Sequence, residues 1–204
     1  MFIAFEGGEG AGKSTQVRGL TERLTAEGHV VRATREPGGT PSGAAIRGIV
    51  LDHAHAALSA RAEALLYAAD RAQHVHEVIR PALDAGEVVL TDRFVDSSLA
   101  YQGAGRAIPL DDVRKLSAWA TEGLRPDLTV LLDLPPEDGL ARARGRATAD
   151  RLEAESLDFH KRVRQTFLAL AGADAARYLV LDARRSPDEL AAEIRLRVTE
   201  LLHA

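Results

Sequence analysis

Two hydrophobic patterns alternate along this chain of 204 residues. Short runs of consecutive apolar residues are typical of β-strands that are covered on both faces. Between these runs, apolar residues recur every three or four positions, which is typical of amphipathic helices. The predicted strands are residues 1–7, 29–36, 87–93, 126–135 and 176–183. Such alternation predicts an α/β fold with three layers, in which helices flank both faces of a five-stranded parallel sheet.

Helical spacing predicts the connecting elements, and glycines at residues 28 and 86 are plausible ends for two of them. The helix predicted over residues 109–123 carries Trp119 and Leu116 on one apolar face, so we expect Trp119 to be packed. Residues 103–106 are predicted to form a loop. The remaining predicted helices are residues 13–28, 41–51, 59–86, 94–104, 137–172 and 186–204. The helix predicted over residues 137–172 has a weak point at residues 145–149.

Composition limits the classes of protein. With 46% hydrophobic and 27% charged residues, the chain is expected to form one globular domain over residues 1–204. It contains no cysteine, which excludes disulfides and thiolate chemistry. The net charge of −4 argues against a protein that coats nucleic acid. Because no apolar run approaches roughly 18 residues, we expect a cytoplasmic protein that acts on small molecules, with neither a membrane nor a nucleic acid as partner.

A glycine-rich loop follows the first predicted strand and precedes a helix. Gly7, Gly12, Lys13 and Ser14 have the G-x-x-x-x-G-K-S spacing of a P-loop, whose backbone N–H groups cradle phosphates. Lys13 is expected to bridge the β- and γ-phosphates of a nucleoside triphosphate, and Ser14 to hold Mg²⁺. The carboxylate of Glu9 stands in this anion-binding loop, and its role there needs an explanation. The predicted phosphate-binding residues are Gly7, Gly8, Glu9, Gly10, Ala11, Gly12, Lys13, Ser14 and Thr15.

The P-loop fixes the ligand but not the reaction. Switch GTPases read guanine through an Asn-Lys-x-Asp element, and this chain has no asparagine. ATPases of the motor type place a glutamate after a strand-end aspartate, whereas here Arg93 follows Asp92 and Leu134 follows Asp133. A small-molecule kinase instead binds a second, acidic substrate and excludes water. We therefore expect arginines that face the loop and a lid that closes over it.

An arginine-rich segment at about residues 142–151 is the candidate lid. Arg142 and Arg146 are four positions apart and would share one helix face. One interpretation is a solvated basic helix; the other is a lid whose guanidinium groups stabilise the charge of the transferring phosphoryl group. The candidate lid residues are Arg142, Arg144, Arg146 and Arg151, and the first and third of them are candidate catalytic groups.

Several motifs together have a more specific meaning. The chain resembles the thymidylate kinases from residue 2 to about residue 170, and the resemblance implies a P-loop NTPase fold, ATP-dependent phosphorylation of dTMP to dTDP, and a homodimer to which the long helix at residues 59–84 would contribute. It rests on these motifs, in this order: "FEGGEGAGKST", "TREPGGT", "LLYAADRAQHV", "LTDRFVDSSLAYQGAGR", "PDLTVLLDLPPEDGLARARGR" and "DRLEAESLDFHKRV".

The resemblance implies roles on the dTMP side. Tyr67 would stack on thymine, and Arg71 would reach the base edge from the same helix face. Ser98 and Gln102 match positions that contact the pyrimidine, and Tyr101 matches the aromatic residue under the deoxyribose. Further acceptor-side candidates are Glu36, Pro37, Arg35 and Arg47.

The same resemblance assigns charged groups near the phosphates. Arg93 would grip the acceptor phosphate, Asp92 would lie near Mg²⁺, and Arg184, with Ala183, would border the adenine. Glu9 would accept a hydrogen bond from the 3′-hydroxyl of the sugar. In some thymidylate kinases an arginine follows this acid and serves the γ-phosphate, but here Gly10 follows it. We therefore expect the missing cation to come from residues 142–151.

Two alternatives to this function stay open from the sequence. One is a related kinase that acts on another nucleoside monophosphate or on a deoxynucleoside. The other is a regulatory P-loop ATPase without an acceptor substrate.

Overall fold

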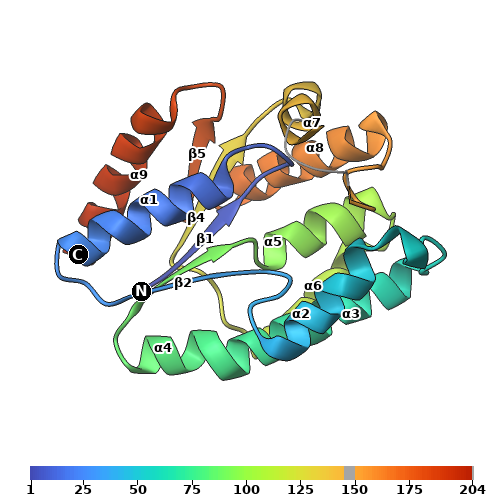
Figure 1. Ribbon diagram of the computed structural model, residues 1–204, viewed down its shortest axis with the longest axis horizontal. Helices are drawn as coiled ribbons and strands as arrows, with labels where there is room; N and C mark the ends of the chain where they lie inside the picture. The colour runs from blue at the N-terminus through green and yellow to red at the C-terminus, as the bar shows by residue number, and fades with distance from the viewer. Residues whose placement is uncertain (145–149, 204) are drawn as a thin grey trace.

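The computed structural model describes residues 1–144 and 150–203. Within these residues, five strands form one parallel sheet in the order β2-β3-β1-β4-β5 (Figure 1). The strands are β1 (Phe2–Glu6), β2 (Val31–Arg35), β3 (Val88–Asp92), β4 (Leu128–Asp133) and β5 (Tyr178–Asp182). The predicted α/β fold with a parallel sheet is confirmed.

Helices connect the strands. The helices of the described residues are α1 (Lys13–Ala26), α2 (Pro41–Leu51), α3 (Ala60–His74), α4 (Arg80–Asp84), α5 (Val95–Ser98), α6 (Leu110–Thr121), α7 (Pro136–Arg144), α8 (Leu157–Ala173) and α9 (Pro187–Leu202). A short 3₁₀ helix covers His53–His55, and two π-helical segments cover Val75–Ile79 and Leu99–Gly105.

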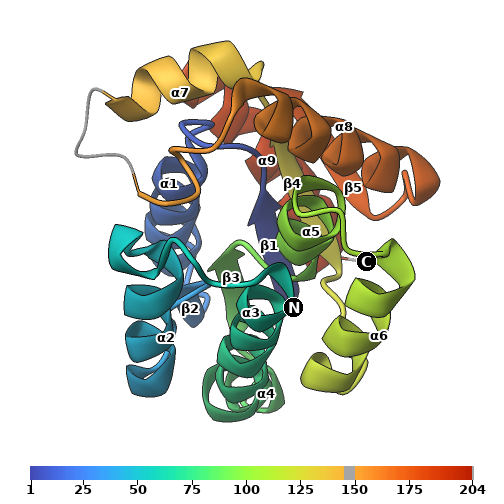
Figure 2. The ribbon, with the colours of Figure 1, turned by 90° about the vertical axis from the view of Figure 1, so that its right-hand side faces the viewer.

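The sheet is covered on both faces, as Figures 1 and 2 show. On one face, α1 and α9 pack against each other and bury Ile3 and Phe5 of β1. On the other face, the segment around Val75 and α4 covers Phe2, and α8 packs against β4. Successive residues of β1 thus enter different cores, which explains why the apolar run of this strand is continuous.

The strand β2 departs from the prediction of strands that are buried on both faces. It lies at the edge of the sheet, where Arg32, Ala33 and Arg35 are exposed. Polar and apolar residues alternate along β2, which is typical of an edge strand rather than of a central strand.

The helix predicted over residues 59–86 is helical from Ala60 to Asp84, with a π-helical segment, Val75–Ile79, between α3 and α4. Three other local predictions were wrong. The predicted loop at residues 103–106 is largely part of the π-helical segment Leu99–Gly105, and residues 150–156 form turns rather than helix. Trp119 is 80% exposed, because the face of α6 that carries it points to solvent. Among the described residues, no helix combines the length and the apolar character that a membrane crossing requires.

Candidate active site

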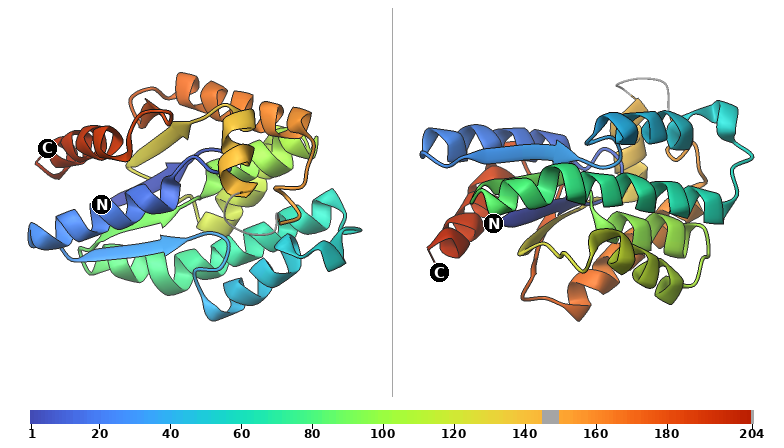
Figure 3. Two further views of the ribbon diagram at one scale, coloured as in Figure 1. Left: turned by 45° about the horizontal axis from the view of Figure 1, so that its top comes forward. Right: turned by 90° about the horizontal axis from the view of Figure 1, so that it is seen from below.

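The glycine loop joins β1 to α1 at the carboxyl edge of the sheet, and its backbone is shaped by close contacts. Gly7 and Gly10 have φ values of 138° and 66°, in the region that disfavours side chains. A Cβ atom at Gly7 would lie 2.4 Å from the carbonyl oxygen of Leu132, and one at Gly10 would lie 2.3 Å from that of Gly139. These contacts seat the loop between β4 and α7, as the left view of Figure 3 shows.

Lys13 begins α1 and turns back over the loop. Its Nζ donates to the carbonyl oxygens of Gly7, at 3.1 Å, and Gly8, at 2.8 Å. Burial lowers the pKa of Lys13 and the charge of Arg93 lowers it further, whereas Asp92 opposes both effects. Gly12 is the N-cap of α1, and no side chain caps the helix there. The first N–H groups of α1 therefore remain available to an anion, and the positive end of the helix dipole lies at the same place.

Ser14 and Asp92 meet beside this lysine. The hydroxyl of Ser14 donates to a carboxylate oxygen of Asp92 over 2.6 Å, which joins the start of α1 to the end of β3. A hydroxyl and a carboxylate are the hard oxygen ligands that Mg²⁺ prefers. The two residues predicted to hold the metal therefore form a pair with suitable chemistry.

Glu9 points away from the phosphate cradle and towards Arg93. Its Oε1 accepts hydrogen bonds from the Arg93 guanidinium, at 2.7 Å, and from the Tyr101 hydroxyl, at 2.8 Å. Burial alone would raise the pKa of Glu9, but Arg93, Lys13 and Tyr101 outweigh it and lower the value to about 2. The carboxylate is thus ionised, and its charge is compensated mainly by Arg93.

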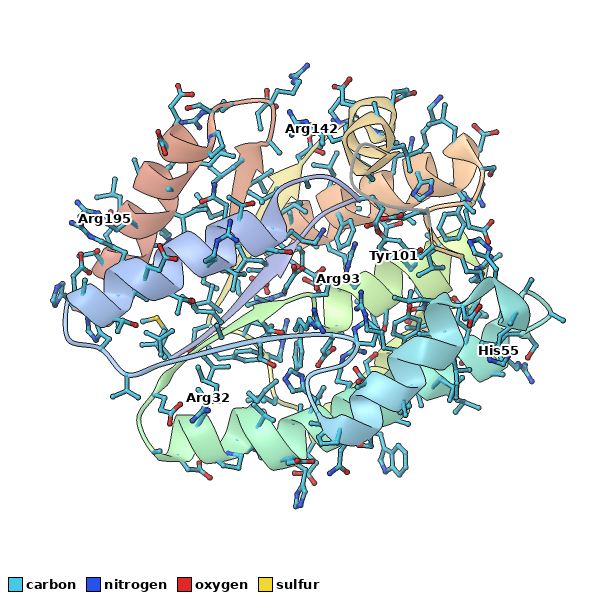
Figure 4. All side chains as sticks on the ribbon, viewed as in Figure 1. Arg32, His55, Arg93, Tyr101, Arg142 and Arg195 are labelled. Atoms are coloured by element: carbon cyan, nitrogen blue, oxygen red, sulfur yellow. The ribbon has the colours of Figure 1, made fainter. Side chains whose placement is uncertain are left out.

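Arg93 is the centre of this cluster. The guanidinium also donates to the carbonyl oxygen of Gly7, at 3.1 Å, and to the hydroxyl of Ser97, at 3.0 Å, and it lies over the Tyr101 ring. Its backbone has a φ of 74°, which is uncommon for a residue other than glycine and marks a constrained, functional position. Figure 4 shows Arg93 and Tyr101 beside one another in the middle of the molecule.

Arg71 on α3 is one of the most deeply buried charges in the described chain, with 1% of its surface exposed. It donates to Glu36, at 2.7 Å, to the hydroxyl of Ser98, at 2.9 Å, and to the carbonyl oxygen of Phe94, at 2.9 Å. Arg71 is therefore a buried, ion-paired group rather than a surface charge. Tyr67, one turn earlier, is also buried and lines the same cavity.

Most predicted residues line one cavity of about 280 Å³. It runs from the P-loop to α3 and to the segment Leu99–Gly105, so one space connects the phosphate loop with the predicted base site. The predicted residues at its wall are Glu9, Gly10, Ala11, Gly12, Lys13, Ser14, Thr15, Arg35, Glu36, Pro37, Arg47, Tyr67, Arg71, Asp92, Arg93, Ser98, Tyr101 and Gln102.

The arginines of the predicted lid separate in the structure. Arg142 lies on α7, exposed, and donates to the carbonyl oxygen of Ala183 over 3.0 Å, at the rim of the molecule in Figure 4. A Cβ atom at Gly10 would lie 3.1 Å from that of Arg142, so this arginine stands next to the loop position that lacks a cation. Arg146, and the side chain of Arg144, lie outside the described residues.

Two predicted arginines are committed elsewhere. Arg151 is buried and donates to the carbonyl oxygen of Val50, at 2.9 Å, and to Glu63. The prediction that Arg151 is a lid cation was therefore wrong. Its guanidinium anchors the end of the arginine-rich segment and is not free to reach a phosphate. Arg184 is exposed and pairs with Asp182 at 2.8 Å, outside the cavity wall.

Sequence reasoning missed several buried polar residues that hold the site together. Glu63 and His74 lie on the same face of α3 as Tyr67 and Arg71, because all four are spaced by three or four positions. His74 contacts Glu36 at 2.9 Å. The polar residues at buried helix spacing, in register with Tyr67 and Arg71, were the signal that could have found them.

Further cavity residues were also missed. Asp150, Leu152 and Glu153, at the end of the arginine-rich segment and just after it, line the cavity together with Ser97 and Ala143. Glu6, at the end of β1, accepts hydrogen bonds from the backbone of Phe94, at 2.8 Å, and from the hydroxyl of Ser97, at 2.6 Å. It therefore fixes the backbone that carries Arg93.

Comparison with known proteins agrees with this geometry. The family described as Thymidylate kinase matches residues 5–194. A thymidylate kinase from Clavibacter michiganensis subsp. michiganensis is 57% identical over 207 residues, covering 100% of this chain and 97% of the relative. One from Deinococcus radiodurans is 57% identical over 203 residues, covering 100% of this chain and 98% of the relative.

A solved structure leads to the same family. The crystal structure of thymidylate kinase from Ehrlichia chaffeensis superposes with a TM-score of 0.77 at 28% identity, covering 97% of this chain and 98% of that one. The resemblance found in the sequence is thereby confirmed on full-length relatives as well as on a shared fold. This chain belongs to the thymidylate kinase family.

Proposed function

We propose that this chain transfers the γ-phosphoryl group of ATP to the phosphate of dTMP, which gives ADP and dTDP. The observation that carries the proposal is one cavity whose wall contains both Lys13 of the glycine loop and Arg93 after β3. Arg93 is fixed by Glu9, Tyr101 and Ser97, so it is a preorganised cation at the seam between donor and acceptor.

The chemistry needs alignment more than acid–base catalysis. An oxygen of the dTMP phosphate is already a nucleophile, and its bond to the γ-phosphorus forms as the bond to the ADP oxygen breaks. Negative charge spreads over the equatorial oxygens in the transition state, and positioned cations stabilise it. We assign this role to Lys13 on the donor side and to Arg93 on the acceptor side.

Mg²⁺ is proposed as the cofactor, held by Ser14 and Asp92. Their hydroxyl and carboxylate lie 2.6 Å apart at the start of α1, next to the lysine that serves the same phosphates. When bound, Mg²⁺ neutralises charge on the donor phosphates and orients them. We expect Asp92 to make part of its contact through water.

Glu9 is proposed to read the sugar. Because Arg93 and Tyr101 hold the carboxylate on the acceptor side, it is placed to accept a hydrogen bond from the 3′-hydroxyl of dTMP. The ring of Tyr101 would lie under the same sugar and disfavour a 2′-hydroxyl. Exclusion of one hydroxyl by contact alone is modest, so we expect incomplete selection for deoxyribose.

The chain is proposed to be one domain, residues 1–204, with an arginine-rich lid at about residues 142–151. Arg142, Arg144 and Arg146 remain the proposed lid cations, since Arg151 is committed to Glu63. Arg142 supports this proposal because it stands beside Gly10, where no loop side chain can supply a charge. We propose Glu36, Pro37, Arg47, Tyr67, Arg71, Ser98 and Gln102 as the remaining dTMP site, and Arg184 as a neighbour of the adenine.

We further propose that the protein acts in the cytoplasm as a homodimer that pairs through α3 and α6. These two helices pack against each other, and both carry large exposed apolar side chains. Leu65 on α3 is 57% exposed and Trp119 on α6 is 80% exposed. Light scattering after size exclusion tests this: the protein should be a dimer, and Trp119→Glu with Leu65→Glu should yield a monomer.

One assay separates the proposed reaction from its alternatives. Purified protein with ATP and Mg²⁺ is given dTMP, dUMP, UMP, dCMP, dGMP or thymidine, and ADP release is followed for each acceptor. Fastest turnover with dTMP is the expected result. Faster turnover with another acceptor would overturn the substrate, and ATP hydrolysis independent of any acceptor would indicate a regulatory ATPase.

A further inference from the structure

Glu63 is a buried carboxylate behind the wall of the proposed base site. It lies on α3, none of its surface is exposed, and it does not line the cavity. Three side chains donate to it: Gln102 through Nε2 at 2.9 Å, Arg106 through Nε at 3.2 Å, and Arg151 at 2.5 Å. Of these three donors, only Gln102 also lines the cavity.

The protonation state of Glu63 decides the orientation of Gln102. Burial alone would raise the pKa of Glu63, but hydrogen bonds from Gln102, Arg106 and Arg151 outweigh it and hold the pKa below its usual value. An ionised carboxylate accepts hydrogen bonds and donates none. The amide NH₂ of Gln102 must therefore face Glu63, and the amide oxygen is left to accept from another group. Because Gln102 lines the cavity, we infer that this oxygen is offered there.

The neighbouring groups complete a pattern of donors and acceptors. Arg71 donates to the hydroxyl oxygen of Ser98 over 2.9 Å, so the hydroxyl proton of Ser98 is left to donate to another group. Ser98 precedes Gln102 by four residues, and both line the cavity wall. This wall thus presents an acceptor, the Gln102 oxygen, beside donors from Ser98 and Arg71.

Only some bases complement that pattern. Thymine and uracil present the N3–H donor between the O2 and O4 acceptors, which fits an acceptor flanked by donors. Cytosine presents an N4 amino donor next to an N3 acceptor, so each group would face its own kind. A mismatch of this type leaves buried polar groups unpaired, and sites that bind by hydrogen bonds reject such analogues strongly.

We propose that Glu63 is a positioning residue for base selectivity: it holds the Gln102 amide in the orientation that offers its oxygen to the N3–H of the acceptor base. The inference rests on the proposed phosphorylation of dTMP and deepens it. It explains why a carboxylate that contacts no substrate is buried at this place. Discrimination between thymine and uracil is not part of this role, since both present the same edge.

The test compares two variants at one cluster. Glu63→Gln keeps the size of the side chain but can both donate and accept, so the Gln102 amide is free to turn over. Its ratio of kcat/KM for dTMP to that for dCMP should fall about 10-fold or more. Arg106→Gln removes another donor to Glu63 and leaves the Gln102 contact in place. It should lower Tm and leave the ratio within about twofold of wild type.

Two results would overturn the proposal. One is a Glu63→Gln variant that keeps the wild-type ratio. The other is an Arg106→Gln variant that loses the ratio equally, because the cluster would then act on stability alone.

A measurement on the unaltered protein decides the orientation if Glu63→Gln does not fold. The side-chain amide signal of Gln102 is identified by its loss in Gln102→Met, and its hydrogen exchange is followed with and without dTMP. The NH₂ should be protected in both states. Exchange as fast as that of surface amides, or a nuclear Overhauser contact between this NH₂ and the thymine ring, would overturn the inference. Because the free protein suffices, a failure of the proposed substrate remains distinguishable from a failure of the Glu63 role.

Discussion

The proposed acceptor and donor sides of the cavity are built differently. On the acceptor side, Glu9, Arg93 and Tyr101 bond to one another within 3.2 Å, and buried Arg71 has three separate partners. On the proposed donor side, Lys13 donates to the carbonyl oxygens of Gly7 and Gly8. Arg142 and Arg184, the proposed donor-side arginines, are exposed and do not line the cavity.

This difference follows from what each side must recognise. Triphosphates are the same in every nucleotide, and backbone N–H groups at a helix N-terminus bind them without reading a base. The acceptor must be distinguished by its base, sugar and single phosphate, which needs side chains held in fixed positions. We therefore expect substitutions on the acceptor side to change selectivity and those on the donor side to change rate.

The largest effect is expected for Arg93→Met. This change removes the preorganised cation between the substrates, and kcat/KM for dTMP should fall by about 10³-fold. Arg93→Lys should restore little, because an ammonium cannot reach the four groups that the guanidinium bonds. Steady-state kinetics measure both. Arg32→Met, at an exposed pair with Glu87, is the control, and a loss under tenfold for Arg93→Met would contradict the assignment.

Arg142→Ala tests whether the donor side acts mainly on rate. Its contact with the transferring group would form in the transition state, so kcat should fall by about 10²-fold while KM for dTMP changes little. The matched control is Arg185→Ala, since Arg185 is a nearby surface arginine that pairs with Glu193. A change confined to KM would show that Arg142 binds substrate without a catalytic role.

Glu9→Gln separates the two halves of the loop. The variant should raise KM for dTMP about tenfold and KM for ATP by less than about twofold, because the carboxylate faces the acceptor. Equal losses for both substrates would place Glu9 in the donor site.

The low pKa of Glu9 adds a second readout. Since the folded value of about 2 lies below the unfolded one, the ionised carboxylate stabilises the fold at neutral pH. That contribution is lost as the pH falls through about 4 towards 2. Wild type should therefore lose more stability than Glu9→Gln over this acidic range, which thermal melts at each pH measure.

The smallest effect on catalysis is expected at Glu6, which supports the backbone beside Arg93. Burial, together with the neighbouring Asp96, raises the pKa of Glu6 to about 8. The unfolded chain loses this proton near pH 4.5, so wild type should lose stability as the pH rises from about 4.5 towards 8. Glu6→Gln should remove that slope while keeping the contacts with Phe94 and Ser97. A variant that loses stability with pH as wild type does would refute the raised pKa.

The two sides also differ in how well the sequence predicted them. The proposed donor loop is a local motif, so four residue identities within eight consecutive positions sufficed to place Lys13 and Ser14. The acceptor side depends on partners far apart in the chain: Glu63 meets Arg151 across 88 positions, and Glu36 meets Arg71 across 35. Arg151 was therefore misread as a free lid cation, and Glu63 was overlooked, since neither local spacing nor charge shows which residues meet when the sheet assembles.

The family resemblance supplied what local patterns could not. Without it, Tyr67 and Arg71 would have been interpreted as a core aromatic and a surface charge. The fold was predictable because apolar runs and helical spacing follow directly from burial. The edge position of β2 and the solvent-facing side of α6 were not, because both depend on which neighbour each element finds.

That solvent-facing side also provides an optical probe. Trp119 is the only tryptophan in the sequence and does not line the cavity, so nucleotide binding should leave its fluorescence nearly unchanged. In the exposed monomer its emission should be red-shifted, and pairing through α6 would bury the indole and shift the emission to the blue. Self-association could thus be titrated by intrinsic fluorescence, without a label and independently of catalysis.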